Sequence, residues 1–164
     1  MKIGAFAGKF LPPHLGHVTQ IEKCAEYVDK LYVVVAEDAQ RSASICKAAG
    51  LDPIDGEMRV KWLKEHFKNN SKIEVVYLDE SGLKAFPEGL EEWSQRFKSK
   101  IKGVNVKFAD ETYRELNEKY FPECEFVPFD RMVIPISATM IRNDIKNNIN
   151  YIIEEARDYF KKYL

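Results

Sequence analysis

Apolar residues along this chain follow two spacings, one typical of β-strands and one typical of α-helices. Short apolar runs rich in β-branched residues predict strands at residues 3–7, 31–36, 73–78, 104–108 and 125–128. Apolar residues three or four positions apart predict helices at residues 18–28, 57–68, 90–100 and 113–120. Polar connections are expected over residues 37–56 and 81–89. Because helices separate the strands, the pattern predicts a parallel sheet with right-handed crossovers.

The predicted fold is α/β, a Rossmann-like three-layer arrangement with a central parallel sheet. At 164 residues and 45% hydrophobic, the chain has the size and composition of one domain spanning residues 1–164. Residues 145–164 are expected to form one or two helices that close this fold. One compact domain is therefore expected to carry the function.

Charge and composition exclude several classes of protein. The 25 basic and 26 acidic residues nearly cancel, so we expect no binding to nucleic acid or to an anionic membrane. No apolar run approaches the roughly 20 residues of a membrane span, and the N-terminal run is too short for a signal peptide. Three widely spaced cysteines, Cys24, Cys46 and Cys124, indicate reduced thiols. These features predict a cytoplasmic protein.

The segment Gly8-Lys9-Phe10-Leu11-Pro12-Pro13-His14-Leu15-Gly16-His17 follows the first predicted strand. It places two imidazoles beside a glycine at the start of a helix, where backbone N–H groups favour an anion. It has neither the dinucleotide fingerprint nor the P-loop spacing. The plain alternative is a pair of half-exposed histidines that open a helix, and a zinc site would need further ligands. We interpret the segment as a phosphate site.

A second polar segment lies far along the chain, at Ile136-Ser137-Ala138-Thr139-Met140-Ile141-Arg142. Ser137 is a natural N-cap, Thr139 adds a hydroxyl in the first turn, and Arg142 follows one turn later. Amides, hydroxyls and a guanidinium could bind a polyphosphate together. Alone, the segment is more typical of a capped surface helix.

Together the two segments resemble the paired signature of the nucleotidyltransferases that carry a His-x-Gly-His motif. Within that superfamily the chain is similar to the nicotinamide mononucleotide adenylyltransferases, including the adenylyltransferase domain of the bifunctional bacterial NAD-biosynthesis regulator. Further matching pieces are Arg59-Val60-Lys61-Trp62-Leu63, Phe86-Pro87-Glu88-Gly89 with Trp93-Ser94, Asp110-Glu111-Thr112-Tyr113, and Asp130-Arg131. They span most of the chain in the expected order.

The resemblance implies adenylyl transfer from ATP to nicotinamide mononucleotide, giving NAD and pyrophosphate, with Mg²⁺ held mainly by the ATP phosphates and no metal site on the protein. It assigns the catalytic roles to Lys9, His14, His17 and Arg142. The implied ATP-binding residues are Gly8, Lys9, Phe10, His14, Gly16, His17, Arg131, Ile136, Ser137, Thr139 and Arg142. The implied acceptor-binding residues are Phe10, Arg59, Asp79 and Trp93.

Some residues have a plainer interpretation or depart from the family. Trp93 could be a core aromatic on its helix, whereas Trp62 is expected in the core and His66 on the surface. Ala138 stands where relatives often have glycine, and Leu90 replaces a second aromatic near Trp93. The replacement at Leu90 affects the assignment of the acceptor and does not affect the assignment of ATP.

The sequence leaves other functions open. Phosphopantetheine adenylyltransferase has a similar length and a related pair of motifs, and a cytidylyltransferase fits the final motif less well. A non-catalytic sensor that binds NAD or ATP is an alternative of another class. We expect no repressor or kinase activity from this chain. Its oligomeric state, including a homo-oligomer, and its preference between nicotinamide and nicotinate mononucleotides are not determined by these residues.

Overall fold

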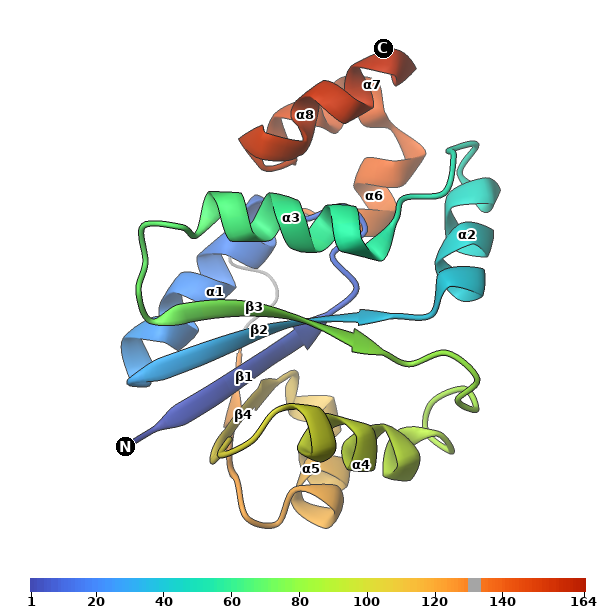
Figure 1. Cartoon of the computed structure of the whole chain (residues 1–164). Helices are drawn as coiled ribbons and strands as arrows, with labels where there is room; N and C mark the ends of the chain where they lie inside the picture. Colours follow the sequence, from blue (N-terminus) through green and yellow to red (C-terminus); the bar gives the residue numbers. More distant parts are fainter. Residues whose placement is uncertain (130–133) are drawn as a thin grey trace.

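The computed structural model confirms the α/β fold, with a five-stranded parallel sheet between two layers of helices (Figure 1). It describes residues 1–129 and 134–164. The strands are β1 (Ile3–Gly8), β2 (Lys30–Glu37), β3 (Ile73–Asp79), β4 (Val106–Ala109) and β5 (Glu125–Pro128). They lie in the order β3-β2-β1-β4-β5, with every neighbouring pair parallel. The order reverses between β1 and β4, which is where ligands bind in open sheets of this kind.

Helices cover both faces of the sheet. The described α-helices are α1 (Leu15–Tyr27), α2 (Ala39–Ala48), α3 (Gly56–His66), α4 (Leu90–Lys100), α5 (Arg114–Tyr120), α6 (Ala138–Asn143), α7 (Ile145–Asn148) and α8 (Glu154–Phe160). Short 3₁₀ turns lie at η1 (Glu111–Tyr113), η2 (Ile149–Tyr151) and η3 (Lys161–Tyr163). Figure 1 shows α1 and α3 on one face and α4 and α5 on the other. None of the helices in the two described ranges is long and apolar enough to cross a membrane.

The prediction of a polar connection over residues 37–56 is wrong in part, because α2 lies within it. Only Ser42 and Cys46 of α2 are buried, so the apolar spacing that predicts a helix is too sparse here. The helix instead begins at a side-chain cap, since Asp38 accepts hydrogen bonds from the N–H groups of Gln40 and Arg41. Elsewhere the boundaries shift slightly. The fourth strand begins at Val106, and 3₁₀ turns extend the helices of residues 113–120 and 145–164.

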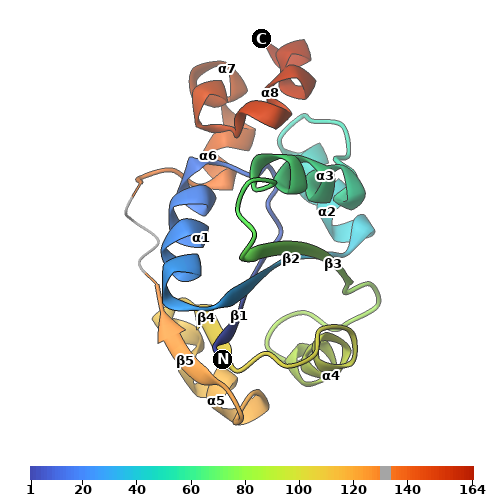
Figure 2. The ribbon, with the colours of Figure 1, turned by 60° about the vertical axis from the view of Figure 1, so that its left-hand side comes forward.

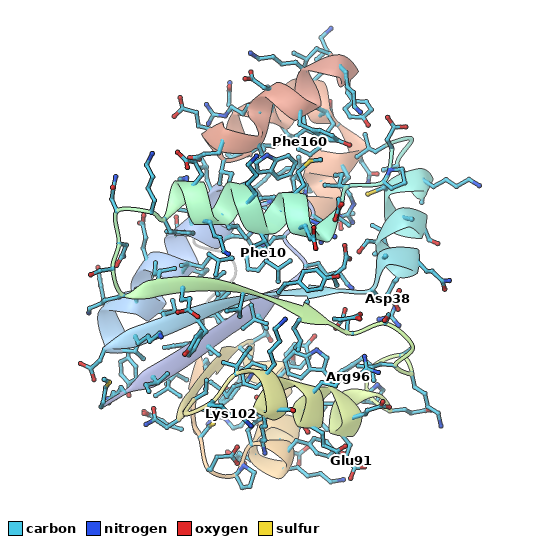
Figure 3. All side chains as sticks on the ribbon, in the orientation of Figure 1. Phe10, Asp38, Glu91, Arg96, Lys102 and Phe160 are labelled. Atoms are coloured by element: carbon cyan, nitrogen blue, oxygen red, sulfur yellow. The ribbon has the colours of Figure 1, made fainter. Side chains whose placement is uncertain are left out.

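Two hydrophobic cores lie on the two faces of the sheet. Along β2, Val33 and Val35 belong to the core beneath α1 and α3, whereas Val34 belongs to the core beneath α4. This alternation follows from the twofold repeat of a strand. Both faces are covered, so the apolar side chains in the middle of β2 enter one core or the other in turn. Figure 3 shows Phe10 and Phe160 on the α3 side.

The C-terminal helices pack on α1 and α3 and hold the loop before α1 (Figure 2). The N–H of Ile153 donates to the carbonyl of Pro13 at 3.2 Å, and Ile152 forms a β-bridge with His14. Trp62 contacts the rings of Tyr159 and Phe160, which confirms its place in the core.

The expectation that His66 lies on the surface is wrong. Its ring is half-buried, because α8 packs against α3 at this point. The Nδ1 atom of His66 lies 2.8 Å from a carboxylate oxygen of Glu155. His66 therefore connects two helices of the fold.

Candidate active site

The two histidines of the first motif form the N-terminal cap of α1. Nδ1 of His14 accepts a hydrogen bond from the N–H of Gly16 at 3.0 Å, and Nδ1 of His17 accepts from the N–H of His14 at 3.2 Å. This is a capping box built from imidazoles instead of a hydroxyl and a carboxylate. Since both Nδ1 atoms accept, the proton of each neutral ring lies on Nε2. The two rings stack with centroids 3.7 Å apart.

Burial keeps His14 neutral. Its side chain is buried, and burial lowers the pKa of His14 to about 4, because a charged imidazole would lose its water there. A Cβ atom at Gly16 would lie 2.8 Å from Cε1 of His14, so only glycine allows the ring to pack against the helix backbone. The ring of His14 is thus held as a neutral hydrogen-bond donor.

The second motif packs directly beside the first. Arg142 donates from one terminal nitrogen to the carbonyl of Leu11 at 2.7 Å and from the other to the hydroxyl of Thr139 at 3.2 Å. Ser137 caps α6 by accepting from the N–H of Met140 at 3.2 Å, and both hydroxyl residues are exposed. A Cβ atom at Gly16 would lie 3.5 Å from Ile136. We call His14, Gly16, His17, Thr139 and Arg142 the histidine cluster.

Phe10 supports the histidine cluster from below. It adopts a left-handed backbone conformation with φ of 53° and is buried. Its ring contacts His17 edge-on at 4.7 Å between centroids and Phe6 at 6.1 Å. Packing therefore fixes the ring of His17, and Phe10 is placed behind the site and not on its open side.

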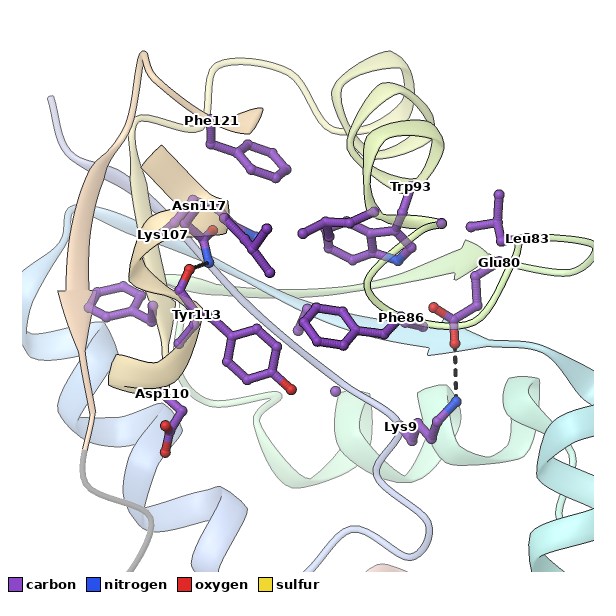
Figure 4. Close-up of a pocket in the computed structure, with 18 of the residues that line it drawn as sticks. Lys9, Glu80, Leu83, Phe86, Trp93, Lys107, Asp110, Tyr113, Asn117 and Phe121 are labelled. Atoms are coloured by element: carbon purple, nitrogen blue, oxygen red, sulfur yellow. Dashed lines mark hydrogen bonds and ion pairs between the residues drawn. The ribbon is translucent and has the colours of Figure 1, made fainter. Parts of the chain in front are cut away.

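A pocket of about 370 Å³ opens beside this loop, between β1, β4, α4 and α5 (Figure 4). We call it the aromatic pocket. Its wall includes Gly8, Lys9, Glu80, Phe86, Trp93, Lys107, Asp110, Tyr113, Asn117 and Phe121. Trp93 thus faces the pocket while it packs on Phe97 with ring centroids 5.4 Å apart. Lys9 contributes to the same wall, and its ammonium pairs with Glu80 at 3.1 Å.

Arg59 lies outside this wall, contrary to the expected arrangement. It is completely buried, pairs with Glu37, and donates to the carbonyl of Lys9 at 2.6 Å and to that of Ile54 at 3.2 Å. Glu37 also accepts from the hydroxyl of Ser42. The structure therefore places Arg59 under the loop, where it fixes the backbone of Lys9.

Asp79 also lies outside the wall. It is exposed at the end of β3 and accepts from the N–H of Ser81 at 2.9 Å, whereas its neighbour Glu80 lines the pocket. Asp79 is pointed away because consecutive residues of an extended chain alternate in direction. Arg131, expected near ATP, lies outside the described residues.

Lys107 is a buried cation of the pocket wall that the sequence did not predict. Between Val106 and Phe108 it looks like the polar position of an alternating strand, with its side chain in water. In the structure it is only 4% exposed, because α4 and α5 cover that face of the sheet. The sequence did contain a signal for this burial, because a lysine within a strand is buried when helices cover both faces of a parallel sheet.

The described residues can bind two kinds of group side by side. The histidine cluster presents imidazoles, hydroxyls and a guanidinium, which suit phosphate oxygens. The aromatic pocket presents flat apolar rings, which suit a planar ring. Within residues 1–129 and 134–164, no three His, Cys, Asp or Glu side chains lie together as metal ligands.

Comparisons with known proteins match this arrangement. The family described as cytidylyltransferase-like matches residues 5–144. The trifunctional NAD biosynthesis/regulator protein NadR of Salmonella typhimurium (strain LT2) is 26% identical over 166 residues, covering 96% of this chain and 40% of that protein. A crystal structure of NadR protein in complex with NAD and AMP-PNP has a TM-score of 0.76 and 32% identity, covering 97% of this chain and 46% of that one.

A second solved structure shares the fold alone. It is a bifunctional NMN adenylyltransferase/ADP ribose pyrophosphatase from Francisella tularensis, complexed with AMP and a manganese ion, with a TM-score of 0.70, 16% identity, and coverage of 99% of this chain and 48% of that one. The chain thus spans less than half the length of each of these relatives. Because the family match extends over most of the chain and includes both motifs, the chain belongs to the cytidylyltransferase-like family of nucleotidyltransferases and resembles the adenylyltransferase domain of NadR.

Proposed function

We propose that this chain transfers the adenylyl group of ATP to nicotinamide mononucleotide or its close analogue, giving a dinucleotide and pyrophosphate. One observation carries the proposal. The bond from Arg142 to the carbonyl of Leu11 joins the two motifs of the family into a single cluster of phosphate-binding groups, directly beside a pocket for a planar ring. The NadR protein was crystallised with NAD and AMP-PNP, which supports the same pair of substrates.

The proposed chemistry needs no protein nucleophile. An oxygen of the acceptor's 5′-phosphate attacks the α-phosphorus of ATP, a new P–O bond forms, and the bond to the bridging oxygen breaks to release pyrophosphate. ATP enters as its Mg²⁺ complex, and the ion neutralises phosphate charge. Positioning and charge stabilisation supply most of the catalysis in such a transfer.

The histidine cluster acts on the leaving group in this mechanism. Nε2–H of His14 and of His17 would donate to phosphate oxygens as negative charge moves towards pyrophosphate. Arg142 and the hydroxyl of Thr139 would hold the β- and γ-phosphates, with Ser137 at the start of the same helix. Because His14 is neutral, it can donate a hydrogen bond to ATP without placing a positive charge in the site when ATP is absent.

The acceptor would lie in the aromatic pocket with its ring against Trp93. The indole face and the apolar wall suit a flat aromatic ring. Lys9 stands between the pocket and the loop, where it can meet the phosphate of the acceptor. We predict that Arg59 does not contact the acceptor, because its guanidinium pairs with Glu37 and donates to the carbonyl of Lys9.

A single assay tests this function. The protein is incubated with ATP, Mg²⁺ and one acceptor at a time, and pyrophosphate and the dinucleotide are measured together. Equal amounts of both products with a pyridine mononucleotide support the proposal. Product with 4′-phosphopantetheine alone would make the chain a pantetheine enzyme, and nucleotide binding without any product would make it a sensor.

A further inference from the structure

Lys107 is a buried charged group that lines the aromatic pocket. It lies on β4 opposite Ala5 of β1, on the face of the sheet that α4 and α5 cover. Its ammonium is enclosed by three aromatic rings, 4.5 Å from the centroid of Phe97, 4.5 Å from that of Phe121 and 5.1 Å from that of Trp93. With 4% of its surface exposed, it is buried like a core residue, yet it lines the aromatic pocket (Figure 4).

Burial and the nearby Cys124 act on this ammonium, and no carboxylate within residues 1–129 and 134–164 does. The pocket wall contains two acidic side chains, and each is engaged elsewhere. Glu80 pairs with Lys9 at 3.1 Å, and Asp110 caps η1 by accepting from the N–H of Thr112 at 3.0 Å. Burial among aromatic rings, without an acid, lowers the pKa of Lys107 to about 8, so it is still mostly charged at neutral pH.

An unpaired buried ammonium costs free energy, and aromatic faces offset only part of that cost. A ligand with an anionic group at this point would supply the missing partner. A ligand with a fixed positive charge would raise the cost further, because two cations would share one poorly solvated pocket. The pocket therefore selects among planar rings by the charge of their substituents.

The two pyridine mononucleotides differ at the relevant group. Both carry a pyridinium ring, but nicotinamide mononucleotide bears a neutral carboxamide, whereas nicotinate mononucleotide bears a carboxylate that balances the charge of its ring. A ring stacked on Trp93 lies beside the ammonium of Lys107, since both line one pocket. The carboxylate can pair with that ammonium, and the carboxamide offers only a neutral oxygen beside a second cation.

We propose that Lys107 is a specificity-determining residue for the acceptor, which binds a carboxylate on the pyridine ring and favours nicotinate mononucleotide over nicotinamide mononucleotide. This inference rests on the proposed function, because it assumes that a pyridine mononucleotide occupies the pocket. It assigns to Lys107 a contact with the ring substituent and no part in the transfer itself.

The test compares kcat/KM for the two mononucleotides at saturating Mg²⁺–ATP in the wild-type chain and in Lys107→Met. Methionine keeps the length and apolar stem of lysine and removes the charge. The wild type should favour the nicotinate compound roughly ten- to hundredfold, as expected for a hydrogen bond between charged groups. Lys107→Met should lose most of this preference, through a higher KM for nicotinate mononucleotide at nearly constant kcat.

Lys98→Met provides a matched control. The ammonium of Lys98 also lies over Phe121, at 4.8 Å from the ring centroid, but its side chain is 42% exposed and pairs with Glu123 at 3.0 Å. This variant should keep the wild-type preference. Calorimetric binding of each mononucleotide to the wild type and to Lys107→Met gives a second readout that does not depend on turnover.

The outcomes separate the two proposals. Adenylyl transfer with a wild-type preference for nicotinamide mononucleotide, or an unchanged preference in Lys107→Met, overturns the role of Lys107 and leaves the proposed function standing. Adenylyl transfer to neither mononucleotide overturns both. The preference of the wild type alone tests the inference if Lys107→Met does not fold.

Discussion

The histidine cluster and the aromatic pocket lie side by side, but they are built in different ways. In the histidine cluster, short hydrogen bonds to the backbone fix the side chains, such as those from Gly16 to His14 and from Arg142 to Leu11. In the aromatic pocket, side chains from separate strands, helices and loops enclose a space, and ring packing such as that of Trp93 on Phe97 sets much of its shape. The histidine cluster is therefore organised before any ligand binds. The aromatic pocket contains the buried charge of Lys107, for which a ligand would supply the partner.

This difference separates the two tasks of a transferase. Phosphate positions must be exact, because catalysis by charge stabilisation depends on donors that need not move. The acceptor pocket has to distinguish similar rings, and an unsatisfied charge is an effective way to do so. The capping histidines serve the first task as fixed donors. Lys107 serves the second task as a buried charge that distinguishes between ligands.

Arg59 lies under the loop that runs from the aromatic pocket to the histidine cluster, and its loss should have the largest effect. It holds the carbonyl of Lys9 and forms a completely buried pair with Glu37. Arg59→Met leaves a buried carboxylate without its partner, which should lower the free energy of unfolding by about 3–5 kcal/mol in urea titrations. Replacing both members, with Arg59→Met and Glu37→Leu, should recover most of that loss. A loss below about 1 kcal/mol in the single variant would contradict this structural role.

The second prediction concerns the pH dependence of stability. It compares one titratable group from each region, His14 and Lys107. The native pKa of His14 is about 4 instead of 6.5, and that of Lys107 is about 8 instead of 10.5. In both cases the unfolded chain binds the proton more tightly, so stability rises with pH between the two values. His14 should therefore cost up to about 3 kcal/mol of stability as the pH falls from 6.5 towards 4.

Lys107 should give the same sign in the range from pH 8 to 10.5. His14→Asn keeps an N-cap and should flatten the acid slope alone, whereas Lys107→Met should flatten the alkaline slope and raise stability at neutral pH. The measurement is the free energy of unfolding of each variant across both ranges. Slopes that do not depend on these substitutions would show that other groups titrate there.

The sequence predicted the first region far better than the second, for a physical reason. The histidine cluster depends on local spacing, since a capping box joins residues three positions apart, and a motif records that spacing directly. Even the contact with α6 could be predicted, because the family resemblance pairs the two motifs. The parallel sheet followed from the apolar pattern in the same way.

The aromatic pocket and the buried position of Arg59 depend on which faces of the sheet the helices cover. Lys107 looks solvated until α4 and α5 are placed over it, and Arg59 looks available to a ligand until α3 is packed on β2 and β3. Burial of a polar residue is a property of the tertiary structure, and neither local spacing nor composition reveals it. The missed helix α2 has a different, local cause, because its capping residue and not its apolar spacing defines it.

A third prediction separates the cap from the catalysis within the histidine cluster. His17→Ala should lower turnover about a hundredfold, because one donor to the phosphates is lost. His17→Gln retains a side-chain acceptor for the N–H of His14 and should keep the stability of α1 without restoring the donor geometry. Turnover and thermal unfolding are measured on the same samples. Full recovery of turnover by glutamine would reduce the role of His17 to capping.

The smallest expected effect tests the aromatic pocket with the two tryptophans of the chain. Trp93→Leu removes a flat surface from the pocket wall, so KM for the mononucleotide should rise about tenfold while KM for ATP stays the same. Trp62→Leu removes the same group from the core beside Tyr159 and should lower stability without any selective change in KM. If both variants raise the two KM values equally, Trp93 serves only in packing. In that case the ring of the acceptor would have to lie elsewhere, and the buried charge of Lys107 would lose its proposed partner as well.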